Sequence, residues 1–176
     1  MIAAQSRETL PADLETLFNE HYHLLYRTAY GVTGNRDDAE DVLQSLFVRL
    51  LQNGFAPELK RNPPGYLHRA VVNLSLNTLR ARKRQKLVDG VEDLAISVAP
   101  AQERHAAREH ELHDQLTDAL AQLKPRALEI LMLHYKHDYT DAQIAALLGT
   151  SRGSIAVTLF RIRAKLRTLL RAAGSE

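Results

Sequence analysis

The sequence predicts an all-α protein with two helical domains joined by a flexible linker. Nearly every patterned stretch of its 176 residues repeats apolar side chains at steps of three and four, which is the period of an amphipathic helix. Eight glycines and six prolines, few of them adjacent, are too few turn signals for a sheet-rich fold. The helical pattern lapses between residues 88 and 104. We therefore predict domains at residues 1–87 and 105–176, with residues 88–104 as the linker.

Two helices open the first domain. One face of the first helix is apolar and includes Leu14, Leu17, Phe18, Tyr22, Leu25 and Tyr26. The pattern breaks from Gly31 to Asn35, and Asn35 is a good N-cap because its side chain can accept a hydrogen bond from a free backbone N–H. Carboxylates follow in the first turns of the second helix, where the helix dipole favours anions. A buried stripe is then expected at Val42, Leu43, Leu46, Phe47, Leu50 and Leu51.

The segment from Asn53 to Pro64 contains glycine and proline and is predicted to be a loop. A third helix begins near Gly65 and continues into the basic run Arg80–Lys86. It carries groups that can stack on, or hydrogen-bond to, bases outside a duplex: Tyr66, His68, Arg69, Asn73, Ser75 and Asn77.

In the second domain the helical pattern resumes near Arg104, with Leu112, Leu116, Leu120 and Leu123 at helical spacing. Pro125 can open the next helix, since proline is tolerated in a first turn. One face of that helix carries Leu128, Leu131, Met132 and Tyr135.

Tyr139 to Leu159 has the pattern of a helix-turn-helix. Thr140 and Gln143 form a capping box, and Gly149 stands where the turn needs a residue that accepts positive φ. Ser151 can cap the second helix, which in such motifs enters the major groove of DNA. Its outward side chains are predicted to be Arg152, Ser154, Ala156, Val157, Phe160, Arg161 and Arg163, while Lys165, Arg167 and Arg171 are better suited to phosphate contacts.

Charge is distributed in blocks along the chain. Residues 61–86 carry seven Lys or Arg and no acid, whereas residues 87–123 carry eight acidic residues and two basic ones. Residues 1–60 carry five basic and nine acidic residues, and residues 124–176 carry nine basic and four acidic ones. Two separate positive blocks indicate a chain that contacts a polyanion at two places.

With these motifs in place, the chain resembles the extracytoplasmic-function (ECF) group of bacterial RNA polymerase sigma factors, over nearly all of residues 10–171. The N-terminal resemblance rests on Leu17-Phe18, Asp38–Leu50, Pro64–Leu67, Ala70–Leu74 and the basic run. The C-terminal resemblance rests on Leu123–Arg126, Asp141–Ala145, Leu148–Ser151, Gly153–Ile155 and Leu159–Leu166. The resemblance implies that residues 1–87 are sigma domain 2 and that residues 105–176 are sigma domain 4.

The resemblance also implies roles for individual residues. Polymerase binding, at the β′ clamp, falls to Glu40, Asp41, Gln44 and Phe47. Capture of the melted −10 element falls to Tyr66, Arg69, Asn73, Asn77, Arg80, Arg82, Lys83 and Arg84. Reading of the −35 duplex falls to Arg152, Ser154, Val157, Phe160, Arg161 and Arg163. Implied partners are core RNA polymerase (β′ clamp and β flap), promoter DNA and an anti-sigma factor.

This sequence departs from the family pattern in places. Ala156, Val157 and Thr158 stand where relatives usually place basic or hydroxyl side chains early in the recognition helix. Two explanations stay open: a T-rich −35 element read through methyl groups, or weaker DNA binding. The family's frequent arginine shortly after the proline is Leu128 here, and Arg126 is the nearest substitute.

Other functions fit the sequence less well. An enzyme is disfavoured because the carboxylates cluster at one helix start, and no phosphate loop or nucleophile elbow is present. Histidine pairs at a spacing that shares a helix face could hold zinc; the histidines concerned are His105, His110, His113, His134 and His137. Exposed histidines on amphipathic helices are commoner, and no metal or cofactor is predicted. A helix-turn-helix regulator acting alone and a sigma-like protein that binds polymerase without initiating are the alternatives. With no cysteine, no signal-peptide core and no apolar run of membrane length, we expect a cytoplasmic protein.

Overall fold

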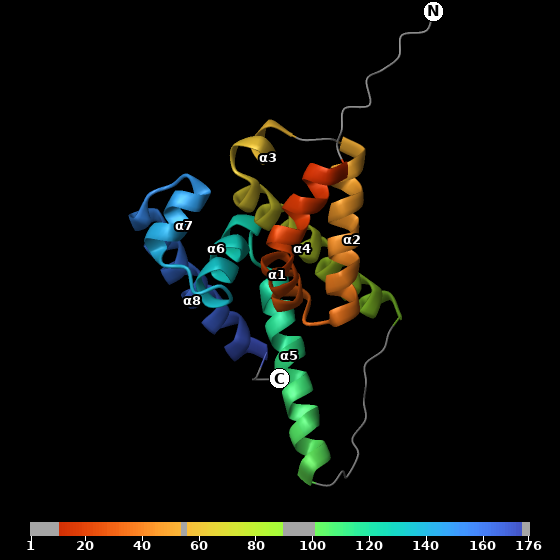
Figure 1. Cartoon of the computed structure of the whole chain (residues 1–176). Helices are drawn as coiled ribbons and strands as arrows, with labels where there is room; N and C mark the ends of the chain where they lie inside the picture. The colour runs from red at the N-terminus through yellow and green to blue at the C-terminus, as the bar shows by residue number, and fades with distance from the viewer. Residues whose placement is uncertain (1–10, 54–55, 90–100, 174–176) are drawn as a thin grey trace, which may run out of the picture.

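The computed structural model describes residues 11–53, 56–89 and 101–173 (Figure 1). Its elements within these ranges are helices, with no strand among them, as the sequence predicts. In chain order they are α1 (Pro11–Thr33), α2 (Arg36–Asn53), α3 (Pro57–Arg61), α4 (Pro63–Asp89), α5 (Ala101–Ala121), α6 (Pro125–Tyr135), α7 (Asp141–Leu148) and α8 (Arg152–Ala173).

Helices α1, α2 and α4 pack together as an N-terminal bundle. Its buried centre is aliphatic, with Leu25, Leu46, Leu67 and Val71 all nearly inaccessible to water. The predicted cap of α2 is confirmed, because the Asp38 backbone N–H donates to Asn35 Oδ1 over 3.0 Å. The end of α1 at Thr33 follows from the same short connection, where Gly34 takes a φ of +65°.

Three local predictions in this bundle were wrong. The expected loop before α4 contains α3, whose Leu59 is buried in the core and so anchors a turn that opens on Pro57. Helix α4 begins at Pro63 rather than near Gly65, since a first turn tolerates proline. Leu51 is 50% exposed, because the buried stripe of α2 ends at Leu50.

The C-terminal helices contain the predicted helix-turn-helix, formed by α7 and α8. Thr140 and Gln143 make the full capping box, and the Ser154 backbone N–H donates to Ser151 Oγ over 3.1 Å. Gly149 takes a φ of +63° between the two helices. Ile144, Ile155 and Leu159 form their shared core with α6.

A third cluster of buried side chains joins the two halves of the molecule. Val72, Leu76 and Leu79 on α4 pack against side chains from α5, the α5–α6 connection, α6 and α8, including Leu120, Leu123, Leu128 and Ile162. We call this contact the seam. Helix α5 lies on the seam at its C-terminal end, while its N-terminal half extends away from the rest of the molecule with exposed side chains at residues 108–113 (Figure 1).

Residues 90–100, the middle of the predicted linker, lie outside the described residues. Both ends of the predicted linker (residues 88–104) are helical. Helix α4 runs to Asp89, and α5 starts at Ala101, three residues before the expected Arg104. Among the helices described, none combines the length and apolar character that crossing a membrane requires.

Candidate functional site

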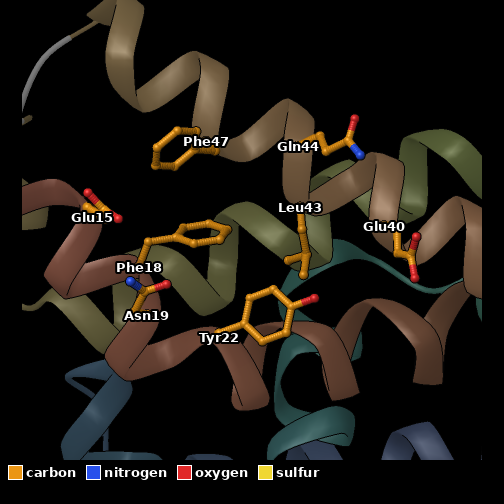
Figure 2. A pocket seen from close by; sticks show the side chains of 8 residues that line it. All are labelled: Glu15, Phe18, Asn19, Tyr22, Glu40, Leu43, Gln44 and Phe47. Atoms are coloured by element: carbon orange, nitrogen blue, oxygen red, sulfur yellow. The ribbon is translucent and has the colours of Figure 1, made fainter. Parts of the chain in front are cut away.

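A groove lies between α1 and α2 on the outer side of the N-terminal bundle. Its volume is about 530 Å³, and it is lined by Glu15, Phe18, Asn19, Tyr22, Glu40, Leu43, Gln44 and Phe47. Figure 2 shows the Phe18 and Phe47 rings facing each other across it, one from each helix. Their centroids are 5.2 Å apart in an edge-to-face arrangement. The groove is therefore an aromatic slot between two fixed helices.

Acidic side chains lie along the rim of this slot. Glu15 and Glu40 both line it, and Glu40 accepts a hydrogen bond from Arg36 Nε over 3.1 Å. An apolar floor with a negative rim fits an amphipathic partner that carries basic side chains. Three of the four residues predicted for polymerase binding, Glu40, Gln44 and Phe47, meet here; the fourth, Asp41, is exposed on the same helix but is not among the lining residues.

Helix α8 exposes a second candidate surface. All six side chains predicted to read duplex DNA are exposed, namely Arg152, Ser154, Val157, Phe160, Arg161 and Arg163. Phe160 is 70% exposed, so it is not part of the core beside its buried neighbour Leu159. Arg163 Nε donates to the Tyr135 hydroxyl over 2.6 Å, and its guanidinium lies 5.7 Å from that ring's centre. Tyr135 on α6 thus holds one arginine of the surface in place.

The third candidate surface is the basic side of α4, and much of it faces other parts of the chain. Arg80 donates from Nε to the Ala121 carbonyl and from Nη2 to the Leu123 carbonyl, each over 3.1 Å. Lys83 Nζ lies 3.0 Å from Asp118 Oδ2. Arg82 pairs instead with Asp38 of α2, over 2.7 Å. Of the other predicted residues, Asn73, Asn77 and Arg84 are exposed.

A buried carboxylate lies where α4 meets α6. Glu129 is only 2% exposed, and its Oε2 accepts a hydrogen bond from Arg126 Nη1 over 2.8 Å. Its Oε1 lies 3.5 Å from Arg69 Nε, on the opposite helix of the seam. Arg126 also donates to the Leu148 carbonyl, so one arginine ties α6 to the end of α7. Two cations compensate the buried charge, one from each half of the molecule.

Two of the α4 side chains that could stack on or hydrogen-bond to bases do not face outward. His68 and Ser75 are completely buried, so both have a structural role in this arrangement. The His68 ring packs edge-to-face on His137, with centroids 5.8 Å apart. Tyr66, by contrast, is half-buried and lines a hollow of about 300 Å³ shared with the α7–α8 turn.

The described histidines with zinc-ligand spacing do not converge on one point, and several of them contact other side chains instead. His137 Nε2 lies 2.7 Å from Thr28 Oγ1, and since that hydroxyl donates to the Leu24 carbonyl, the ring nitrogen is the donor. His134 lies 3.6 Å from Asp141, and His110 lies 3.9 Å from Asp114. The side chain of His105 is outside the described residues. Among described side chains, no three potential ligands lie close enough to hold a metal ion.

Sequence reasoning missed half of the groove. Phe18 and Tyr22 were assigned to the apolar face of α1, yet Tyr22 is 40% exposed and both rings line the slot. The available signal was that the apolar face of α1 is wider than the core alone would need. That width does not tell which edge of the face remains accessible to a partner. Periodicity also carries no information on the contacts across the seam.

Two family models match the chain. Residues 17–85 match sigma-70 region 2, and residues 113–166 match sigma-70 region 4. The first match covers α2, most of α4 and every residue that lines the groove except Glu15, and the second covers the helix-turn-helix.

Several bacterial proteins are similar along most of the chain. The ECF RNA polymerase sigma factor SigE of Mycolicibacterium smegmatis is 31% identical over 92% of this chain, which spans 63% of that relative's length. The RNA polymerase sigma-E factor of Streptomyces coelicolor is 32% identical, over 81% of this chain and 77% of the relative.

A solved structure shares the fold. The sigma factor RpoE from Bartonella quintana, crystallised in complex with the anti-sigma factor NepR, superposes with a TM-score of 0.52 at 22% identity. The match covers 92% of this chain and 98% of that one.

Proposed function

Since the chain belongs to the ECF group of sigma-70 family sigma factors, we propose that it binds core RNA polymerase and directs transcription initiation at specific promoters. The observation that carries the proposal is the occurrence of both sigma regions, in order, on one chain. The chemistry of RNA synthesis belongs to the polymerase in this scheme, and the chain itself is not a catalyst. Its place of action is then the cytoplasm, with the polymerase.

The groove between α1 and α2 is proposed as the polymerase-docking site. Its facing aromatic rings supply apolar area, and Glu15 and Glu40 supply negative charge at the rim. A basic, amphipathic helical segment of the β′ clamp fits both features, because complementary charge fixes register and speeds encounter. The β flap is the proposed partner of the C-terminal half.

DNA contacts are proposed for α8 and α4. The exposed arginines of α8 can each place two hydrogen bonds on guanine in the major groove, and Val157 and Phe160 can meet thymine methyl groups. Helix α4 is proposed to hold unstacked bases of the −10 element near Asn73, with its arginines on phosphates. Holding an extruded base offsets part of the cost of unpairing, which is a few kcal/mol.

An anti-sigma factor is a further proposed partner. The Bartonella quintana relative was crystallised with one. Such a protein would act by covering the polymerase groove or the DNA-binding helices of this chain.

The proposal that polymerase docks in the groove between α1 and α2 can be tested by substituting one residue that lines it. Gln44→Arg places a cation in the slot, and it should weaken binding of the full chain to core polymerase at least about tenfold. Gln52→Arg makes the same change at an exposed position of α2 outside the groove, and should leave the dissociation constant within about twofold. Equal binding by the two variants would remove the groove from the proposal, and failure of the unaltered chain to bind would remove the function.

A stand-alone helix-turn-helix regulator is not favoured. Such a protein has no need of sigma-70 region 2, which matches residues 17–85. Specific binding of duplex DNA by the purified chain, without polymerase and with two half-sites, would revive that alternative.

A further inference from the structure

One exposed arginine of α8 is held by a residue of another helix. Tyr135, the last residue of α6, contacts the side chain of Arg163. We infer that Tyr135 positions Arg163 on a backbone phosphate of duplex DNA, so that Arg163 sets how α8 lies in the major groove and does not read a base itself. The inference rests on the proposed function of α8 and deepens it, because it divides the α8 arginines by the part of the DNA that each one contacts.

Two contacts fix the guanidinium of Arg163. Its Nε donates a hydrogen bond to the Tyr135 hydroxyl over 2.6 Å, and its central carbon lies 5.7 Å from the centre of the Tyr135 ring. A guanidinium carries five N–H groups in a planar fork, and this hydrogen bond uses only the one on Nε. The N–H groups on Nη1 and Nη2 are then left for a partner that offers two oxygen atoms, as a phosphate group does.

Tyr135 is itself tied to α7 and α8. Helix α6 packs against α8 through a cluster that includes Leu131 and Ile162, so the backbone of Tyr135 has a fixed place beside α8. The Tyr135 ring contacts the His134 ring edge to face, with centroids 4.7 Å apart, and His134 Nδ1 lies 3.6 Å from Asp141 Oδ1 in the first turn of α7. An arginine that is held before DNA arrives loses less side-chain freedom on binding than an unrestrained one.

The place of Arg163 along α8 favours the DNA backbone over the bases. Recognition helices of helix-turn-helix proteins contact base edges with their N-terminal residues. Helix α8 begins at Arg152, and at about 1.5 Å per residue Arg163 lies about 16 Å further along the helix axis. The major groove is about 12 Å wide, so a helix that enters it at Arg152 has reached the sugar-phosphate backbone by Arg163.

Arg163 nevertheless faces the same way as the start of the helix. Its separation from Arg152 is close to three turns of about 3.6 residues, so both exposed side chains lie on one side of α8. Phosphate contacts fix the register and orientation of a protein on the duplex without carrying sequence information. That role matters in this chain because Ala156 and Val157, early in α8, have no polar group that could hydrogen-bond to base edges.

A double-mutant cycle between Tyr135 and Arg163 tests the inference. It uses the complex of core polymerase with the full chain, and as probe a duplex DNA that the complex with the unaltered chain selects from a random-sequence pool. Arg163→Gln should weaken probe binding about tenfold, and Tyr135→Phe, which removes only the hydroxyl oxygen, about threefold. The double variant should bind as weakly as Arg163→Gln alone, because the hydroxyl acts only through this arginine. Both side chains are exposed, so circular dichroism should show an unchanged fold for all three variants.

Two further readouts distinguish a phosphate contact from a base contact. Arg163→Gln should make the slope of the log association constant against log salt concentration shallower by about one, as for one lost phosphate contact. The sequences that this variant selects from the random pool should match those selected with the unaltered chain. Loss of preference at one base pair would show that Arg163 reads a base and would overturn the assignment to phosphate.

Matched controls make the same chemical changes away from α6 and α8. Tyr30→Phe removes the hydroxyl of an exposed tyrosine on α1, and Arg108→Gln removes one positive charge from an exposed position of α5. Both should leave probe affinity within about twofold and the selected sequences unchanged.

The outcomes separate the inference from the function that it assumes. If Tyr135→Phe weakens binding equally with Arg163 and with Arg163→Gln, or does not weaken it at all, the positioning role fails while the proposed function of α8 stands. If the complex with the unaltered chain selects no sequence from the pool, promoter reading fails, and the inference fails with it.

Discussion

His68 is a titratable residue that is fully buried. Burial, and to a lesser extent the nearby His137 ring, lowers its pKa to about 3. The pKa of His137 is lowered to about 4, first by burial and then by the positive charges of Arg27 and Lys136, against a raising effect of Asp138. Both rings are therefore neutral in the packed molecule near neutral pH.

The pH dependence of stability follows from this burial. In the unfolded chain a histidine takes up a proton below about pH 6.5, while His68 in the folded chain stays neutral down to about pH 3. The free energy of unfolding should thus fall with acidification across this window, by up to about 1.4 kcal/mol per pH unit for His68. His68→Leu should flatten the slope measured by urea denaturation between pH 6 and pH 5. Exposed His23→Leu, the control, should keep it; a His68→Leu slope equal to the original would contradict the account.

Phe160 and Leu159 are adjacent, and replacing each with alanine should affect different properties: promoter binding for Phe160 and stability for Leu159. On α8, Phe160 is 70% exposed and the preceding residue, Leu159, is 2% exposed. Phe160→Ala should leave the thermal midpoint nearly unchanged and weaken promoter binding. Leu159→Ala should destabilise the protein by about 2–5 kcal/mol because it opens a cavity. Calorimetry together with duplex binding separates the two effects, and a Phe160→Ala variant that unfolds like Leu159→Ala would show that this ring belongs to the core.

Local elements were the part of the fold that sequence reasoning predicted best. The Asn35 cap, the Thr140–Gln143 capping box and the Gly149 turn are all confirmed, because each depends on residues within four positions of one another. Helix α3 was not predicted, because its formation depends on residues far away in the sequence. It is held by burial of Leu59 against distant helices, which proline and glycine content cannot reveal.

The left-handed turn between α7 and α8 can be tested by replacing glycine with alanine at two positions, one inside the turn and one outside it. Gly149 has a φ of +63°, so Gly149→Ala should cost about 1 kcal/mol even though its new methyl group would meet nothing within 4 Å. Gly153 lies in the first turn of α8 without positive φ, so Gly153→Ala should stabilise by up to about 1 kcal/mol. Chemical denaturation of both variants measures the sign, and two changes of the same sign would contradict the left-handed turn.

At the scale of the whole molecule, two sigma regions pack through the seam. The sequence predicted both helical halves and the residues exposed on α8. It did not predict that Arg69, Arg80 and Lys83 would face α5 and α6, because such contacts depend on how elements far apart in the chain are arranged. The alternating charge blocks were a partial signal, interpreted as two contacts with an external polyanion. The structure shows that one of the basic blocks also contacts the acidic block that follows it.

As a sigma factor, this chain is expected to direct core polymerase to specific start sites. The most direct measurement is transcription in vitro on fragmented bacterial DNA, with core polymerase alone and with the purified chain added, followed by sequencing of RNA 5′ ends. We expect new 5′ ends that share two sequence blocks upstream, at −35 and −10. These ends should disappear with Phe160→Ala/Arg161→Ala although the variant still binds core. An unchanged set of 5′ ends, despite stable binding of the chain to core polymerase, would contradict it.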